Sequence, residues 1–410
     1  MENRPRTEPG QITLQVGQQE GDLRGDDDRV LQAAVDYVSG LGGGRVCVLD
    51  GVYTLNNSLF LKRGVCLSGS GPGTILKKCG GVRHQLVRDA DWYEACVEVA
   101  DAGSFRPGCG IMLRAYAEKG DGLRSVVRET VTRVDQNVIA LSGRLGSDMW
   151  LQDRASATAL FPLITAREGT HDIQVKDITL DGNFSENEEI NGNYSGGVFI
   201  QRCDRWSFHR VTSRNYNGDG FSFQVCDDIH LTECRSEDNA NLGFHPGSGS
   251  QRPVFKECVS ARNSQGIFFC WGVSDGLVDG CVCSYNRDYG ISIGHRDTDN
   301  RILNTEIAGN RKVGVLFREQ EAFRAGHRNV ISGCKISDNG VDLDGVGVDV
   351  RGQTSDVEIR ENVISDTGQG VQKIGVQLGA QTTRIETGHN TFIGLSEDVS
   401  SLSKQKETAS

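Results

Sequence analysis

The second half of the chain consists of short runs of alternating apolar and polar residues, separated by Asn, Asp, Gly and Ser. Residues 251–273, QRPVFKECVSARNSQGIFFCWGV, contain two or three such runs, and none is long enough for a helix of normal length. Alternation with period two indicates half-buried strands, and the small polar residues between the runs indicate turns.

Two residue types repeat in phase with this pattern. Asparagines recur every 23 to 29 residues, at Asn215, Asn239, Asn263, Asn286, Asn310 and Asn339. Glycines recur every 23 or 24 residues, at Gly220, Gly243, Gly266, Gly290 and Gly314. A fixed period of this length is typical of a stacked solenoid. We expect the Asn to adopt a left-handed backbone and to bond along the stack, and the Gly to allow a tight bend. Three short strands per coil predict an all-β fold, a right-handed parallel β-helix with coils about 4.8 Å apart.

The strand after each Gly predicts which side chains face inward. Its first and third residues are apolar in every coil: Phe221 and Phe223, Phe244 and Pro246, Ile267 and Phe269, Ile291 and Ile293, and Val315 and Phe317. Because side chains alternate along a strand, the intervening positions then face outward. The cysteines Cys234, Cys258, Cys281 and Cys334 keep the same register and are expected to be buried packing residues.

The pattern divides the chain into five parts: a polar arm (1–25), a capping helix with the first coils (26–90), a β-rich insertion (91–168), the remaining coils with the active groove (169–395) and a disordered tail (396–410). In DDDRVLQAAVDYVSG, acidic residues precede an apolar face, which predicts an N-capped amphipathic helix over the open end of the solenoid. Residues 91–168 alternate as strands without the coil period, which predicts a compact barrel beside the first coils.

Composition limits the partners. A net charge of −11 argues against nucleic acid and anionic membrane surfaces, and no apolar run approaches membrane-spanning length. Thirteen cysteines without an apolar signal-peptide core indicate reduced thiols and a cytoplasmic protein.

Outward positions near the Gly ladder carry the candidate chemistry. We expect Asp219, His245, His295, Arg318 and Glu319 to be catalytic, and Gln224, Trp271, Arg296, Asp297, Asn191 and Tyr194 to bind substrate. Coil stacking places His245 and His295 two coils apart, about 10 Å, with Trp271 between them. Asn191 and Tyr194 belong to a long loop, residues 181–197, that could wall the groove or be a mobile insertion.

These residue types suit sugar chemistry. An indole stacks on a sugar ring, a guanidinium pairs with a uronate carboxylate, and an imidazole can remove or return the acidified C5 proton. Asp219 could orient His245 or act as an acid or base itself. The alternative is that these side chains are ordinary solvated surface.

Two acidic segments leave a metal role open. His295, Arg296, Asp297 and Asp299 form a turn rich in potential ligands, and Asp342, Asp344 and Asp349 alternate along a strand. Asp and Asn also simply make turns or solvate sheet edges. We therefore expect no metal or other cofactor, with Ca²⁺ as the alternative.

The opening segment resembles the pectate lyase-like superfamily of right-handed parallel β-helix proteins. An acidic N-cap, a short helix, a Gly-rich turn, the G-x-Y strand GVY and the L-x-G-x-G motif LSGSG follow one another within residues 26–71. The resemblance covers residues 26–90 and 168–395. It implies a carbohydrate-active fold that serves polysaccharide lyases, polygalacturonase-type hydrolases, mannuronan C5-epimerases, inulin fructotransferases and phage tailspikes.

The local sequence at one bend is similar to the epimerase motif G-F-D-P-H-D/E. Here the segment reads GFHPGS, so that His245 stands at the Asp position and Gly247 at the His position.

Three functions remain open from the sequence. The first is uronate β-elimination or C5-epimerisation, with His245 and His295 handling protons and Arg318 binding the carboxylate. The second is a glycoside hydrolase or fructotransferase using carboxylates. The third is a glycan-binding or tailspike-like module without catalysis. The resemblance also implies a possible homotrimer.

Overall fold

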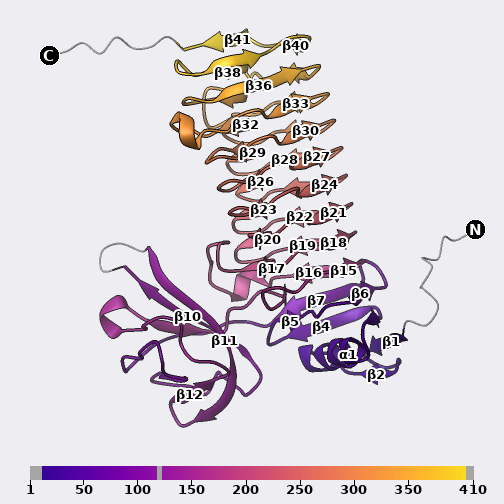
Figure 1. Ribbon diagram of the computed structural model, residues 1–410, viewed down its shortest axis with the longest axis vertical. Helices are drawn as coiled ribbons and strands as arrows, with labels where there is room; N and C mark the ends of the chain where they lie inside the picture. The colour runs from indigo at the N-terminus through magenta and orange to yellow at the C-terminus, as the bar shows by residue number, and fades with distance from the viewer. Residues whose placement is uncertain (1–11, 118–121, 403–410) are drawn as a thin grey trace, which may run out of the picture.

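Every coil of the solenoid contributes one strand to each of three parallel sheets. The computed structural model describes residues 12–117 and 122–402 and shows a tall stack of coils with a smaller body beside its N-terminal end (Figure 1). Neighbouring strands within each sheet come from successive coils and pair in parallel, as β18, β21 and β24 do. The predicted right-handed parallel β-helix is confirmed.

The first sheet has 13 strands, in spatial order β2 (Leu23–Arg24), β1 (Ile12–Gly17), β3 (Gly44–Val48), β6 (Val65–Gly69), β15 (Ile173–Lys176), β18 (Trp206–His209), β21 (His230–Thr232), β24 (Val254–Lys256), β27 (Leu277–Asp279), β30 (Arg301–Leu303), β33 (Val330–Ser332), β36 (Ser355–Arg360) and β39 (Thr383–Glu386). The second sheet has 11 strands: β4 (Gly51–Leu55), β7 (Thr74–Lys78), β16 (Thr179–Asp181), β19 (Thr212–Arg214), β22 (Arg235–Glu237), β25 (Val259–Ala261), β28 (Val282–Ser284), β31 (Glu306–Ala308), β34 (Lys335–Ser337), β37 (Val363–Ser365) and β40 (Thr391–Ile393).

The third sheet contains the Gly ladder. Its 11 strands are β5 (Leu59–Phe60), β14 (Ile164–Thr165), β17 (Gly196–Gln201), β20 (Asp219–Gln224), β23 (Leu242–Pro246), β26 (Gln265–Phe268), β29 (Tyr289–Ile293), β32 (Val313–Phe317), β35 (Val346–Val350), β38 (Ile374–Leu378) and β41 (Glu397–Ser401). Each ladder Gly is the second residue of a strand, so the tight bend expected at these positions is wrong. All ten residues predicted to face inward from β20 to β32 are buried. Aromatic rings stack along this core, with the Phe221 and Phe244 centroids 5.2 Å apart. The four predicted cysteines are buried as well.

The asparagine ladder differs from its prediction in one coil and in its backbone. Buried Asn239, Asn263, Asn286 and Asn310 are linked in sequence, each side chain accepting a hydrogen bond from the backbone N–H one coil before it. Asn215 is exposed and stands one position early, because Tyr216 fills the ladder position of its coil. The left-handed residue is the one before each ladder Asn, such as Asp238 with φ of 57°.

The N-terminal end is closed by helix α1 (Asp28–Gly40). The Asp27 side chain caps it by accepting from the backbone N–H groups of Arg29 and Val30. Its buried face contains Leu31, Ala34, Val35 and Val38 and packs into the same core as the first coils, as expected.

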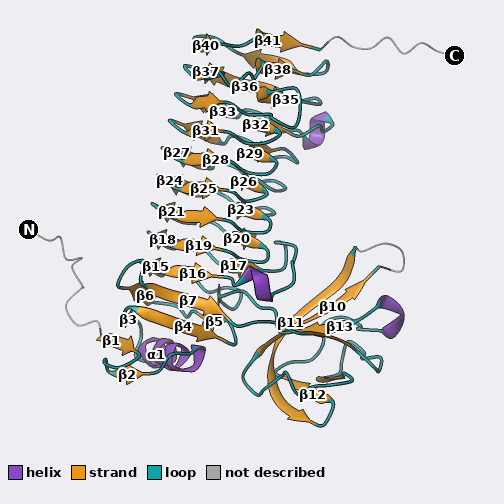
Figure 2. Cartoon of the chain, turned by 180° about the vertical axis from the view of Figure 1, so that it is seen from behind, coloured by secondary structure: helices purple, strands orange, loops and turns teal. Residues whose placement is uncertain are grey.

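The insertion is a small antiparallel barrel with its own core. It contains β8 (Arg83–Gln85), β9 (Cys96–Glu98), β10 (Gly110–Tyr116), β11 (Leu123–Asp135), β12 (Val138–Leu141) and β13 (Ser156–Thr158), with the 3₁₀ turn η1 (Leu151–Asp153). A bridge between Leu86 and Val99 joins the two outermost strands, which closes the barrel. Figure 2 shows it beside the first coils. Its strands extend from Arg83 to Thr158, whereas the expected range was 91–168, and β14 already belongs to the solenoid.

Both ends of the described chain contribute strands where unpaired segments were expected. Residues 12–17 of the expected arm form β1, which pairs with β3, and residues 397–401 of the expected tail form β41, which pairs with β38. The expected disorder of the final residues lies outside the described part of the chain from residue 403 onward.

Candidate functional site

Some of the candidate residues lie on the outward face of the third sheet, and the others lie on the bends and loops next to it. The pairing register aligns Ser222 with His245 and Phe268 with Ser292, and these four residues form one outward row over four coils. A second outward row lies two positions later in each coil and contains Gln224, Cys270 and Arg318.

Asp219 and His245 form a buried pair at the centre of this face. His245 Nδ1 lies 2.7 Å from Asp219 Oδ2, and Asp219 Oδ1 accepts the Leu242 N–H at 3.0 Å. Both side chains are almost fully buried. Burial by itself lowers the pKa of His245, but the charge of Asp219, the hydrogen bond to it and the adjacent Cys270 raise that pKa to about 9. The imidazole is therefore protonated at neutral pH, and its buried Nε2 forms no hydrogen bond of normal geometry.

The loop of residues 181–197 lies across the third sheet instead of standing beside a groove as a wall. The Ser222 hydroxyl donates to the Gly192 carbonyl at 2.8 Å, and Gly192 packs directly against the Asp219 carboxylate. The loop begins with the 3₁₀ turn η2 (Phe184–Glu186), and Arg128 of the barrel donates to the Tyr194 carbonyl at 2.9 Å. We call residues 187–195 the strap. The strap is the reason why Asp219 and Ser222 are shielded from solvent.

Arg318 forms the second buried polar group. Its guanidinium donates to Asp297 Oδ2 and Ser292 Oγ, both at 2.9 Å, and lies 4.4 Å from the Phe268 ring centroid. Phe268 also contacts His245, since the centroids of the two rings are 5.6 Å apart. Phe268 therefore connects the Arg318 group with the Asp219–His245 pair.

Asp297, expected to bind substrate, has a different position. It is fully buried, burial raises its pKa, and its oxygens accept from Arg318 and from the backbone N–H groups of Gly272, Val273 and Gly294. All its acceptor directions are in use, so that Asp297 fixes the bend and positions Arg318.

Trp271 and His295 form an exposed aromatic stack at the bend after the third sheet. Their ring centroids are 4.9 Å apart and nearly parallel, at 12°, and 55% of Trp271 is exposed. Partial burial and the charges of Arg318, Arg324 and Arg296 lower the pKa of His295. The His295 imidazole is therefore neutral at pH 7 and can accept a proton.

The remaining predicted residues are dispersed. Gln224 is buried and bonds the Ser222 hydroxyl, whereas Asn191 is exposed on the strap and Tyr194 is half-buried there. Arg296 is exposed beside His295. Glu319 is exposed in a separate hollow of about 420 Å³ with Phe323 and Arg324. The structure thus gathers Asp219, His245, Arg318 and Asp297, places Trp271 with His295 next to them, and leaves Glu319 apart.

No chemical role was predicted for Cys270. It is nearly buried, and its neighbours include both the His245 imidazole and the Arg318 guanidinium, whose pKa values its charge would raise. Its position two residues after Phe268, in the outward register one coil beyond His245, is the sequence signal that could have identified it.

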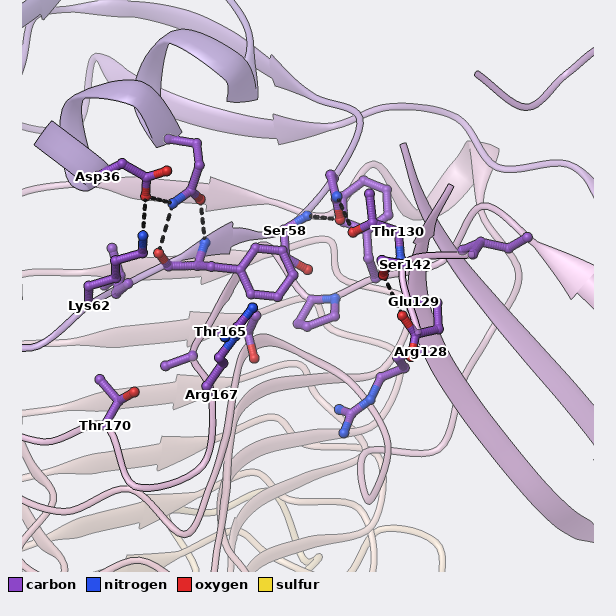
Figure 3. A pocket seen from close by; sticks show the side chains of 18 of the residues that line it. Asp36, Ser58, Lys62, Arg128, Glu129, Thr130, Ser142, Thr165, Arg167 and Thr170 are labelled. Atoms are coloured by element: carbon purple, nitrogen blue, oxygen red, sulfur yellow. Dashed lines mark hydrogen bonds and ion pairs between the residues drawn. The ribbon is translucent and has the colours of Figure 1, made fainter. Parts of the chain in front are cut away.

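A larger cavity of about 850 Å³ opens between the first coils and the barrel (Figure 3). We call the lining residues Phe60, Phe161 and Thr165 its floor. Arg128 and Arg167 extend into the cavity. The sequence did not predict this cavity, because its walls come from segments as far apart in the chain as Gln32 and Thr170.

Across residues 12–117 and 122–402, no three His, Cys, Asp or Glu side chains are grouped so as to hold a metal ion. No helix in that part of the chain is long and apolar enough to cross a membrane.

Comparisons with known proteins agree with the architecture. A family profile described as a right handed beta helix region matches residues 196–324, and one described as a protein of unknown function (DUF1565) matches residues 280–409. No curated protein sequence matches this chain.

The structure is similar to the A-module of mannuronan C-5 epimerase AlgE6 from Azotobacter vinelandii, with a TM-score of 0.56 and 16% identity, covering 93% of both chains. The AlgE4 A-module from the same organism has a TM-score of 0.55 and 17% identity, covering 93% of this chain and 96% of that one. PfbA, a surface adhesin of Streptococcus pneumoniae, has a TM-score of 0.50 and 13% identity, covering 93% of both chains. At such identities the likeness concerns the fold.

Proposed function

We propose that this chain, which folds as a right-handed parallel β-helix, is an enzyme that moves a proton at a uronate of an acidic polysaccharide, as a lyase or a C5-epimerase. One observation carries the proposal: the two outward histidines have pKa values shifted in opposite directions. His295 is neutral and His245 is protonated at neutral pH. Titratable groups whose environments separate their pKa values are typical of an acid and base pair.

The two histidines take complementary roles in this proposal. His295 removes the C5 proton of the uronate. The positive charge of the nearby Arg318 stabilises the negative charge that then develops on the uronate carboxylate. In β-elimination the C4–O bond then breaks, the electron pair leaves on oxygen, and His245 donates its proton to that oxygen, which requires its buried Nε2 to become accessible to the substrate. In epimerisation the C4–O bond stays intact and His245 returns a proton to C5 from the opposite face. Asp219 keeps the His245 imidazole oriented and charged.

Trp271 supplies the binding surface. Its exposed indole is held flat by His295 and can stack on the apolar face of a sugar ring next to the proposed base. The epimerase modules that share the fold act, by their names, on mannuronan, a uronate polymer, which supports this substrate class.

A carboxylate-pair hydrolase or fructotransferase fits the site less well. Asp219 is buried against His245 and the strap, and Glu319 lies four coils away, about 19 Å by strand spacing. Their separation is too large for one glycosidic bond.

A binding module without catalysis is the second candidate. The burial of His245 and the strap across Ser222 favour it, and an adhesin shares the fold. This candidate predicts that glycans are retained without any product.

The test is product analysis after incubation with a panel of uronate polymers, fructans and neutral glycans. We expect unsaturated uronate, detected by ultraviolet absorbance, or a changed C5 configuration, detected by NMR. His295→Gln and His245→Gln should each lower kcat by about 10²–10⁴-fold. The matched control is His230→Gln, which changes an exposed histidine on β21 of the first sheet and should leave turnover unchanged. If both site variants turn over like the wild type, the assignment is wrong.

A further inference from the structure

The cavity between the first coils and the barrel is built by three separate parts of the chain. Gln32 and Asp36 come from α1, Phe60, Thr165 and Arg167 from the first coils, and Arg128 to Thr130 and Ser142 from the barrel. Figure 3 shows Arg128 and Arg167 extending into it, from the barrel side and the coil side respectively. None of the Asp219, His245, Trp271, His295 or Arg318 side chains lines it, so that it is distinct from the site described above.

The cavity contains positive charge that the protein does not neutralise. Within the described part of the chain, Arg128, Arg167 and Arg63 form no ion pair with a carboxylate, although the protein has a net charge of −11. Lys62, the other cation here, is paired with Asp36 at 2.9 Å. Arg128 packs over the Phe199 ring with its charge centre 4.3 Å from the centroid, which fixes its direction. An anion that enters the cavity therefore meets the Arg167 guanidinium and the part of the Arg128 guanidinium that does not donate to the Tyr194 carbonyl, and both can form charge-assisted hydrogen bonds with it.

The other lining groups suit a sugar. Phe60 is half-buried on the cavity floor beside Phe161 and Pro162, and an exposed aromatic face can cover the apolar side of a sugar ring. Hydroxyls of Thr130, Ser142 and Thr170 and the Glu129 carboxylate surround this floor and can bond sugar hydroxyls. A simple anion such as phosphate would use the arginines but not the aromatic floor or the acceptors.

The cavity and the proposed catalytic face lie along the same sheet. β14, β17, β20 and β23 are consecutive strands of the third sheet, so that Thr165 and His245 are three strand spacings apart, about 14 Å. The strap crosses the sheet between them.

We propose that this cavity is a second carbohydrate site, which binds a carboxylate-bearing sugar through Arg167 and Arg128 with the ring against Phe60. Only the class of the ligand, an acidic glycan, rests on the proposed function. The barrel then has a binding role, since Arg128, Glu129 and Ser142 are all barrel residues.

The experiment measures binding of a short oligouronate to the full chain by calorimetry, in wild type and in His245→Gln. A neutral oligosaccharide of equal length, a sulfated oligosaccharide and inorganic phosphate are the comparison ligands. We expect the oligouronate to bind in both proteins and the neutral sugar to bind at least about tenfold more weakly, as loss of a charge-assisted contact implies. Tight binding of phosphate or of the sulfated sugar instead would overturn the carboxylate-sugar assignment.

Arg167→Gln tests the site itself, because that side chain makes no ion pair and its removal should not alter folding. We expect about tenfold weaker oligouronate binding and an unchanged unfolding midpoint. The matched control, Arg301→Gln, removes the same charge from exposed β30 of the first sheet and should bind like the wild type. Equal affinity of the Arg167 and Arg301 variants would overturn the inference. Binding with no product on any polymer would refute the proposed enzyme activity and leave this site intact.

Discussion

At the scale of single residues, the two site histidines differ because one is enclosed with a carboxylate and the other is surrounded by guanidinium groups. Asp219 stabilises the charged form of His245, whereas Arg318, Arg324 and Arg296 disfavour a charge on His295. Environments of this kind decide which group can donate and which can accept a proton.

We expect a bell-shaped dependence of kcat/KM on pH for the proposed reaction. His295 must be unprotonated, and since its pKa is lowered from 6.5, the acid limb should lie below that value. His245 must be protonated, which places the alkaline limb near pH 9. Initial rates from pH 4 to 10 check this. Asp219→Asn should move the alkaline limb to lower pH, and an alkaline limb at the same pH in both proteins would contradict the pairing.

The same pair predicts a pH-dependent stability. The folded-state pKa of His245, about 9, is above the ordinary 6.5 of an unfolded chain, so that its contribution is complete below about pH 6.5 and is lost as pH rises through 9. The contribution is on the order of 3 kcal/mol. Urea unfolding of the wild type should therefore weaken from pH 6.5 to 9.5 by more than that of Asp219→Asn. His230→Gln, the exposed control, should follow the wild type.

The sequence predicted the positions of side chains correctly where the strand register alone decides them. His245 and Asp219 were expected in the same outward region, and they meet at 2.7 Å. Asp297 was expected to reach a substrate, yet it bonds three backbone N–H groups of two bends, and such contacts depend on loop geometry that alternation does not encode. The role of Cys270 was missed because its neighbours His245 and Arg318 belong to other coils, and the side-chain reach that brings them together is not encoded in the alternation.

At the scale of elements, the asparagine ladder holds successive coils together. Asn263 Oδ1 accepts the Asn239 N–H at 3.0 Å and its Nδ2 donates to the Ser236 carbonyl at 2.8 Å, all in the buried interior. Asn263→Ala leaves both groups unpaired, and we expect a loss of about 2–4 kcal/mol in the free energy of unfolding. Urea unfolding measures it. Gln174→Ala, at an exposed position on β15, should change the free energy by no more than about 0.5 kcal/mol.

The strap is the element that sequence reasoning placed least well. Its length suggested a wall, but a long polar segment does not show which surface it covers. Gly192 explains the contact, since a Cβ at that position would overlap the buried Asp219 carboxylate. We expect Gly192→Ala to destabilise the fold by about 1–3 kcal/mol and to expose Asp219. Gly146→Ala, where a Cβ meets open space, is the matched control, and equal unfolding midpoints for the two variants would contradict the contact.

At the scale of the whole molecule, the repeat period was sufficient to predict the solenoid, since the Gly and Asn ladders recur at the same places in successive coils. The boundaries were harder. Residues 12–17 and 397–401 lack the ladder residues of the central coils, yet they pair as strands because a neighbouring coil already offers an unpaired edge. The barrel could be recognised as a separate unit because its alternation lacks the coil period, whereas its position against the third sheet depends on contacts such as Arg128 with Tyr194. The homotrimer stays a prediction, and sedimentation mass tests it.

The two ends of the solenoid should differ in local stability. Helix α1 covers the first coils with a fully buried apolar face, whereas β39, β40 and β41 each pair on one side only within residues 12–117 and 122–402, and most of their side chains are partly or fully exposed. Since each coil is stabilised mainly by its neighbours, opening should begin at the C-terminal end and spread inward. Hydrogen exchange followed by mass spectrometry should show the amides of β39 to β41 exchanging fastest, and those of β20 to β29 slowest among the coils. Equal protection of the last coil and the central coils would mean that another surface covers that end in solution, and an association of chains through the C-terminal edge would then be the explanation to test.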